Sequence, residues 1–259
     1  MRIADKFAEL GLKEEKALIA YVCAGDPSAE ATKDIVNSLV KGGADIVELG
    51  LPFSDPVADG PTIEAASTRA LEAGMTPDIY FEMAASISKD TDVPLVCMTY
   101  YNLIYKRGTE KFAKDCAEAG ITGIIVPDLP AEESDELYDA CQKNGVDLIF
   151  LITPVTTDAR MENNLSRTSG FVYIVSRLGV TGERVDVADS TKKILSRIHT
   201  DVPKAVGFGI SNGKQAAEVI KAGADAVIVG SAFVSIIASD EDVNERVEKL
   251  ASELKESCK

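Results

Sequence analysis

Short apolar runs, many of them rich in Val and Ile, recur along the chain and alternate with segments in which apolar residues have helical spacing. Continuous apolar runs of about four to eight residues are typical of strands buried on both faces. Eight runs predict strands at 17–22, 44–49, 94–99, 123–127, 147–152, 171–175, 204–208 and 226–229. Helices are predicted between them, for example at 29–41, 109–119, 132–143 and 214–222. Several of these helices end at a glycine, as helices commonly do.

Strands that alternate with helices pair in parallel through right-handed crossovers, and eight such units in 259 residues match a (β/α)8 barrel. The predicted fold class is therefore α/β, a (β/α)8 TIM barrel in which residues 1–259 form a single domain with an N-terminal extra helix. A second amphipathic helix at the C-terminal end is expected to lie on the outside of the barrel. An open doubly wound sheet is the alternative, but its G-x-G-x-x-G motif is missing after the first strand, where CAGDPS stands instead.

The charge balance argues against several classes of partner. The chain has 27 Lys and Arg against 42 Asp and Glu, a net charge of −15. Binding to nucleic acid or to an anionic membrane needs clustered basic side chains, so neither is expected. No apolar run approaches the roughly 18 residues of a membrane span, and the N-terminus lacks the apolar region of a secretory signal. We expect a cytoplasmic protein.

The five cysteines have no CxxC spacing, and there is a single histidine, His199. An odd number of cysteines without such spacing argues against a disulfide framework and a zinc site, and favours reduced thiols. One histidine leaves no His-rich metal site. No metal is expected.

One stretch at 44–62, ADIVELGLPFSDPVADGPT, combines a buried strand with two kinds of acid. Glu48 lies within the apolar run, and Asp55 and Asp59 follow in a proline-rich loop. Burial raises the pKa of a carboxyl group, whereas an Asp open to water stays ionised, so Glu48 and Asp59 together predict an acid/base pair. The alternatives are that Glu48 pairs with a cation across the barrel, and that the aspartates only cap the helix near Thr62.

Other polar residues also follow predicted strands, where barrel enzymes gather their chemistry. Tyr100 follows the third strand, Asp128 follows the fourth, and Tyr173 lies near the end of the sixth. The loop at 176–190 is long and carries two glycines, as a mobile lid would. The tyrosines could instead simply pack the barrel mouth.

Glycines cluster in the last third of the chain, in GFGIS (207–211) and VGSAF (229–233). Glycine lets backbone N–H groups approach an anion, and loops after the seventh and eighth strands commonly bind phosphate in this architecture. The sequence therefore predicts a phosphate site there. Tight strand-to-helix turns are the alternative.

Six blocks occur in the order found in tryptophan synthase alpha subunits: ELGLPFSDPVADGPTI, MTYYN, VPDLPAEE, SRLGVTG, GFGIS and VGSAFV. The chain resembles that family over essentially its whole length. The resemblance implies a TIM barrel that cleaves indole-3-glycerol phosphate into indole and glyceraldehyde 3-phosphate. It also implies a partner beta subunit that receives the indole in an alpha2beta2 complex. Pyridoxal phosphate is then the cofactor of the beta subunit, and this chain has none.

The resemblance also implies residue roles. Catalytic roles fall on Glu48, Asp59 and Tyr173, substrate contacts on Tyr21, Tyr100, Thr181 and Phe208, and phosphate contacts on Gly182, Gly209, Gly230 and Ser231. Two departures stand out: Tyr21 occupies a position where the family commonly has Phe, and LITPVTTD lacks paired prolines often present after the fifth strand.

Three functions from different classes remain open at this point. The first is the lyase. The second is a barrel isomerase or epimerase that acts on another sugar phosphate, since it would also use two acids and a phosphate site. The third is a binding subunit that mainly activates its partner.

Overall fold

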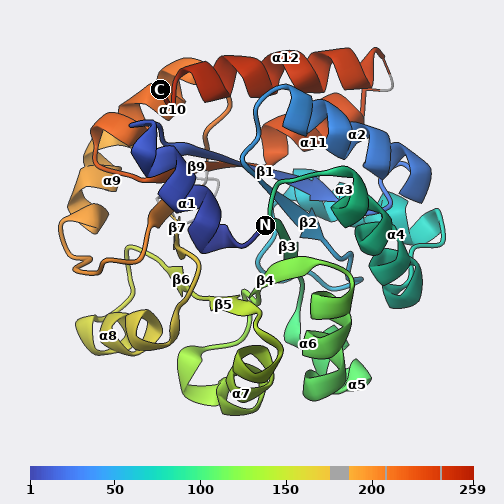
Figure 1. Ribbon diagram of the computed structural model, residues 1–259, viewed down its shortest axis with the longest axis horizontal. Helices are drawn as coiled ribbons and strands as arrows, with labels where there is room; N and C mark the ends of the chain where they lie inside the picture. Colours follow the sequence, from blue (N-terminus) through green and yellow to red (C-terminus); the bar gives the residue numbers. More distant parts are fainter. Residues whose placement is uncertain (176–186, 208, 240) are drawn as a thin grey trace.

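The computed structural model describes residues 1–175, 187–207, 209–239 and 241–259. A nine-stranded parallel sheet has the order β5-β4-β3-β2-β1-β9-β8-β7-β6 (Figure 1). The strands are β1 Ala17–Cys23, β2 Ile46–Gly50, β3 Leu95–Met98, β4 Ile121–Ile125, β5 Asp147–Ile149, β6 Leu151–Ile152, β7 Val172–Val175, β8 Lys204–Gly207 and β9 Ala226–Val229.

Residues 147–152 close the sheet into a barrel. β5 pairs with β4, β6 pairs with β7, and only Phe150 separates the two short strands. The eight predicted strands are therefore all present, with the fifth divided in two. This confirms the α/β TIM-barrel prediction.

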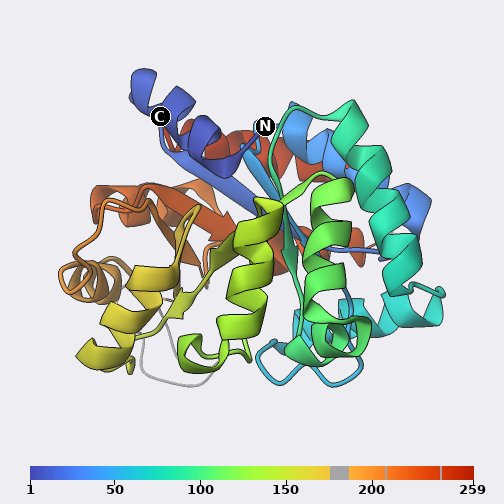
Figure 2. The same ribbon diagram turned by 60° about the horizontal axis from the view of Figure 1, so that its bottom comes forward.

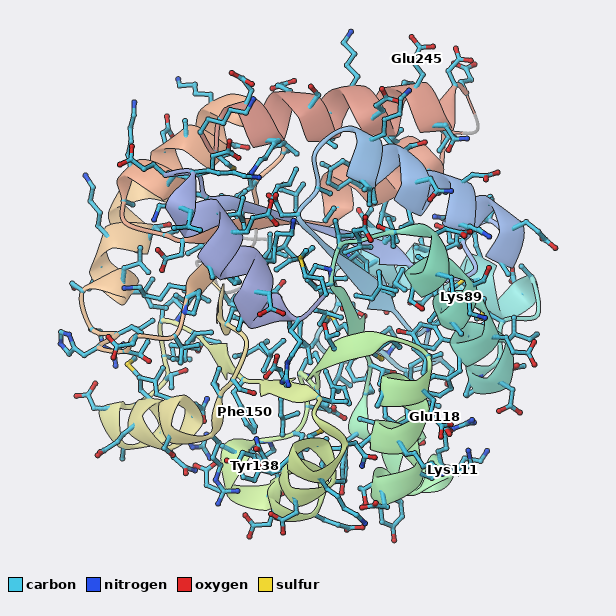
Figure 3. The ribbon with its side chains drawn as sticks, in the orientation of Figure 1. Lys89, Lys111, Glu118, Tyr138, Phe150 and Glu245 are labelled. Carbon is cyan, nitrogen blue, oxygen red and sulfur yellow. The ribbon has the colours of Figure 1, made fainter. Side chains whose placement is uncertain are left out.

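Helices surround the sheet (Figure 1). They are α1 Ile3–Leu12, α2 Ala29–Lys41, α3 Pro61–Glu72, α4 Pro77–Asp90, α5 Tyr101–Arg107, α6 Thr109–Glu118, α7 Asp135–Asn144, α8 Asp158–Arg167, α9 Val187–Leu195, α10 Gly213–Lys221, α11 Ser231–Ile237 and α12 Val243–Glu256, with a 3-10 turn η1 at Ala131–Glu133. Charged side chains such as Lys111, Glu118 and Glu245 lie on the outer faces of these helices (Figure 3).

The buried side chains form two clusters, one between the sheet and the helices and one inside the barrel. The inner cluster contains strand residues such as Ile19, Ile46 and Val96. It also contains Ile3 and Leu10 of α1. The predicted N-terminal extra helix therefore closes one end of the barrel, and Figure 2 shows it opposite the loop that precedes α3. That arrangement leaves the C-terminal strand ends as the open end.

The C-terminal helix lies across the outside of the barrel, as predicted, beside α2 (Figure 1). Near its end, Lys255 donates hydrogen bonds to the Asp45 carboxylate (3.0 Å) and to the Lys16 carbonyl (3.1 Å). A hollow of about 760 Å³ separates α2 from the start of α12 and is lined by polar residues. It lies on the outer surface, away from the C-terminal strand ends.

All five cysteines are buried and free, which confirms the prediction of reduced thiols. Burial raises the pKa of the Cys23, Cys141 and Cys258 thiols to about 12. None of the helices described is both long and apolar enough to cross a membrane.

Candidate active site

Glu48 is an acid inside the barrel. It is the central residue of β2, with Tyr21 of β1 and Val96 of β3 as its neighbours in register. Its side chain is 1% exposed, and neither carboxyl oxygen has a hydrogen-bond partner in the described parts of the chain. Burial, with the charge of Asp59 as a smaller cause, raises the pKa of Glu48 to about 8. The side chain therefore carries a proton at neutral pH.

Among the described residues, no cation lies against the Glu48 carboxyl group. The charged group that acts on its pKa is Asp59, which is itself an acid. Within the part of the chain that the structure describes, nothing supports the alternative that Glu48 pairs with a cation across the barrel. A buried acid without a partner costs stability, and such groups cluster at functional sites.

Asp59 lies in the loop between β2 and α3. Tyr100 holds this loop, because its hydroxyl accepts a hydrogen bond from the Ala58 N–H (3.1 Å) and interacts with the Asp59 carboxylate. Burial raises the pKa of Asp59 to about 6, and the Tyr100 hydroxyl limits that rise. The sequence predicted an Asp open to water, whereas Asp59 is half-buried in the structure. Its carboxyl group nevertheless remains mainly ionised at pH 7. Capping does not explain it, since Gly60 is the N-cap of α3.

Two tyrosines project into the barrel, each against a glycine of the neighbouring strand. A Cβ atom on Gly50 would lie 2.3 Å from the Tyr21 hydroxyl oxygen, and one on Gly207 would lie 3.0 Å from that of Tyr173. Both side chains are buried. Burial is the main cause that raises the pKa of each phenol well above its usual value, and Glu48 and Asp59 contribute to both shifts. Glu48, Asp59, Tyr21 and Tyr173 are therefore brought together.

The predicted phosphate contacts are only partly described. Gly209 follows β8, has a φ of +80°, and would have open space around a Cβ atom. Gly230 and Ser231 follow β9, where α11 begins at Ser231. Since β8 pairs with β9, these three residues lie in adjacent loops. Thr181, Gly182 and Phe208 lie outside the described residues, as do residues 176–186 of the predicted lid at 176–190. The prediction was wrong for its last four residues, since α9 already begins at Val187.

Apolar residues of the site were missed from the sequence. Met98 at the end of β3 and Leu151 in β6 are partly exposed and pack against the inner cluster. They can provide an apolar wall for an aromatic ring. Strand periodicity was the available signal, because Met98 is two residues beyond the inward-facing Val96.

Two polar residues that follow strands have structural contacts. Asp128 accepts a hydrogen bond from the Tyr101 N–H (2.9 Å) at the start of α5. Asp55 is exposed and accepts one from the Ser54 hydroxyl (2.5 Å). Neither adds a carboxylate to the pair formed by Glu48 and Asp59.

Comparison with known proteins places this geometry in a family. The family model described as "Tryptophan synthase alpha chain" matches residues 7–259. The chain belongs to the tryptophan synthase alpha chain family. A curated tryptophan synthase alpha chain of Methanosarcina acetivorans is 63% identical over 254 residues, covering 98% of this chain and 93% of the relative.

Solved structures agree with this membership. The tryptophan synthase subunit alpha of Legionella pneumophila has 34% identity and a TM-score of 0.90, covering 99% of this chain and 98% of its own. A second solved structure concerns mutual activation of the tryptophan synthase a2b2 complex of Pyrococcus furiosus. One of its chains is 36% identical to this chain, with a TM-score of 0.87. That match covers 93% of this chain and 98% of the other. Membership of the tryptophan synthase alpha chain family confirms the resemblance and the enzyme class, and excludes the isomerase or epimerase alternative.

Proposed function

We propose that this chain cleaves indole-3-glycerol phosphate into indole and glyceraldehyde 3-phosphate, as the alpha subunit of tryptophan synthase. One observation carries the proposal. The buried carboxyl group of Glu48, with a pKa of about 8, lies near the half-buried carboxyl group of Asp59, with a pKa of about 6, at the open end of the barrel. Between pH 6 and pH 8, Glu48 is mainly protonated while Asp59 is mainly ionised. A proton donor and an anion can therefore act together in this range.

The cleavage needs a proton donor to carbon and a base for a hydroxyl group. Glu48 gives its proton to C3 of the indole ring, and the ring becomes an iminium cation. The carboxylate left on Glu48 takes the proton of the adjacent side-chain hydroxyl, and the bond between C3 and that carbon breaks. Its electron pair returns to the ring to give indole, the hydroxyl oxygen becomes the aldehyde oxygen of glyceraldehyde 3-phosphate, and Glu48 is again protonated.

Asp59 stays ionised during this cycle. Its charge would stabilise the iminium cation and accept a hydrogen bond from the indole N–H. The apolar wall of Met98 and Leu151 supplies a surface for the ring, and Tyr21, Tyr100 and Tyr173 would bound the space around the reacting bond. Such contacts position the substrate and give binding energy away from the bond that breaks.

The phosphate group would bind at the other side of the mouth. We assign it to the loops after β8 and β9, through Gly209, Gly230 and Ser231 together with Gly182. Open space at Gly209 supports this assignment, since an anion can approach its backbone N–H closely. Thr181 and Phe208 complete the proposed set of substrate contacts.

The proposed partner is a tryptophan synthase beta subunit, which holds pyridoxal phosphate and receives the indole. Two large apolar side chains beyond the ends of β2 and β3 support a docking face there: Val57 is 83% exposed and Tyr105 is 71% exposed. Val57 lies in the same loop as Asp59, so a partner that covers it would restrain that acid. The solved Pyrococcus furiosus structure concerns mutual activation within its own a2b2 complex.

The proposal also takes residues 1–259 as one barrel domain located in the cytoplasm. Packing of α1 against the inner cluster, and of α12 against α2, supports one domain. Five buried free thiols suit a reducing compartment.

Release of indole and glyceraldehyde 3-phosphate from indole-3-glycerol phosphate tests the proposed function. We expect slow release by the chain alone and faster release after the cognate beta subunit is added. Absence of both products in the presence of that partner would refute the lyase. Release that the partner leaves unchanged would refute the proposed coupling only.

A further inference from the structure

The Tyr21 side chain lies between Gly230, which follows β9, and Gly50 of β2, the two strands that pair with β1. It begins beside Gly230, where a Cβ atom would lie 3.4 Å from the Tyr21 Cβ. It ends against Gly50, where any Cβ atom would overlap the hydroxyl oxygen. Gly50 is the next residue after Glu48 on the same face of β2. The Tyr21 hydroxyl therefore lies on the mouth side of Glu48.

This hydroxyl is within the range that the Glu48 side chain can cover. Residues two apart on a strand are separated by roughly 6.6 Å, and a glutamate with three rotatable bonds extends over much of that distance. Tyr21 and Glu48 are also partners in the β1–β2 register. Both carboxyl oxygens of Glu48 are buried without a hydrogen-bond partner among the described residues. The missing partner costs the neutral acid less than it would cost a carboxylate, which needs hydrogen-bond donors in the same place.

We infer that Tyr21 is a positioning residue whose hydroxyl donates a hydrogen bond to the Glu48 carboxylate in the step when Glu48 has lost its proton. The inference rests on the proposed function, in which that carboxylate is an intermediate state. Tyr21 would stabilise the ionised acid between its two proton transfers and hold it toward the substrate. Gly50 is then required because its missing side chain leaves room for the hydroxyl.

Among the described groups that face Glu48, the phenols are the ones that can donate a hydrogen bond to its carboxylate. Asp59, from the loop after β2, is an anion and opposes ionisation of Glu48. Val96 of β3 is apolar. Tyr173 of β7 is a second phenol on which the charge of Glu48 acts. Burial keeps the Tyr21 pKa well above its usual value, so its hydroxyl retains the proton that it donates.

The test compares Tyr21→Phe with the unaltered full-length chain. A donor to the charged form lowers a pKa, so its removal should raise the pKa of Glu48 by about one pH unit, the size expected for one hydrogen bond to a charged group. The carboxyl signal of Glu48 in chain labelled with carbon-13 at glutamate reports this pKa by NMR, and Glu48→Gln assigns the signal. We also expect kcat to fall several-fold while KM changes little.

Tyr80→Phe is the matched control. Tyr80 is buried, and its hydroxyl donates a hydrogen bond to the Leu49 carbonyl (3.0 Å), so this variant also removes a hydroxyl that contacts the segment around β2. It should leave the Glu48 signal with its original pKa. An unchanged or lowered Glu48 pKa in Tyr21→Phe would overturn the inference, as would an equal rise in Tyr80→Phe. The NMR titration measures the pKa of Glu48 without any turnover, so it tests the role of Tyr21 alone. Absence of lyase activity would refute the proposed function and is measured in a different assay.

Discussion

At the scale of single residues, the fold separates the pKa values of two similar side chains. Glu48 is fully buried in the barrel, whereas Asp59 is half-buried and close to the Tyr100 hydroxyl. The difference in burial explains why the pKa is raised to about 8 for Glu48 and to about 6 for Asp59. Their order decides the roles, since the group with the higher pKa is the proton donor at neutral pH.

Glu48→Gln should lose turnover and change how stability depends on pH. Removal of the acid should lower kcat by about 10²-fold to 10⁴-fold. In the wild type, the raised pKa of Glu48 contributes stability that is present below its unfolded-state value of 4.5 and is lost as pH rises through about 8. Glu48→Gln has no titrating group at this position, so it does not lose this stability as pH rises. Its free energy of unfolding relative to wild type should rise between pH 5 and pH 9, by on the order of 3 kcal/mol.

Urea unfolding of both proteins at the two pH values measures that change. A relative stability that stays constant with pH would show that Glu48 titrates normally in the folded state. Loss of folding at both pH values would show a structural role for the side chain.

The sequence predicted the two acids because both stand out locally, one as a carboxyl group in an apolar run and the other in a proline-rich loop. It did not predict the contact between Tyr21 and Gly50, which depends on the direction of a ring across neighbouring strands. Met98 and Leu151 were missed for a related reason, since apolar residues at strand ends look like ordinary core.

At the scale of elements, α3 connects the catalytic loop to the rest of the barrel. The helix begins at Pro61, directly after Asp59 and Gly60. Farther along it, Arg69 donates two hydrogen bonds to the Asp26 carboxylate, at 2.8 and 2.7 Å. Asp26 follows β1 and is only 1% exposed. This ion pair therefore fixes the helix that carries the loop of Asp59.

Arg69→Ala should destabilise the chain strongly, because it leaves the buried Asp26 carboxylate without its cation. Breaking one partner of a fully buried pair costs about 3–5 kcal/mol, and since the Arg69 side chain is 35% exposed we expect a loss of roughly 2–3 kcal/mol here. Lys143→Ala is the control, since Lys143 pairs with Glu110 on the surface (2.7 Å) and exposed pairs contribute about 1 kcal/mol or less. Urea unfolding compares the two variants. Equal losses would contradict a special role for the Arg69 pair.

Element order was predictable because strand and helix periodicities alternate clearly along the chain. The division of the fifth strand at Phe150 was not predictable, since residues 148–152 read as one continuous apolar run. The pair of Asp26 and Arg69 was also beyond local pattern, because 43 positions separate the two residues.

At the scale of the whole molecule, negative charge dominates the surface. The net charge is −15, and acidic side chains such as Glu118 and Glu245 lie on the outer helices (Figure 3). Repulsion among like charges destabilises a compact state, and dissolved salt screens it. The composition predicted this property directly, since a charge sum does not depend on the fold.

Added salt should therefore stabilise the protein. The Debye length falls from about 30 Å at 0.01 M to about 10 Å at 0.1 M, so most of the gain should come at low concentration. We expect Tm, measured by circular dichroism in sodium chloride, to rise by a few degrees and then level off. A Tm that falls over this range would show that favourable surface ion pairs outweigh the repulsion.

The dependence of lyase turnover on pH tests the central claim that a protonated Glu48 acts beside an ionised Asp59. The rate of indole release from indole-3-glycerol phosphate, measured with the cognate beta subunit present, should follow a bell with its maximum near pH 7. It should fall below about 6 as Asp59 becomes protonated, and above about 8 as Glu48 loses its proton. A rate that keeps rising above pH 8 would contradict the account, because no protonated Glu48 would then be needed.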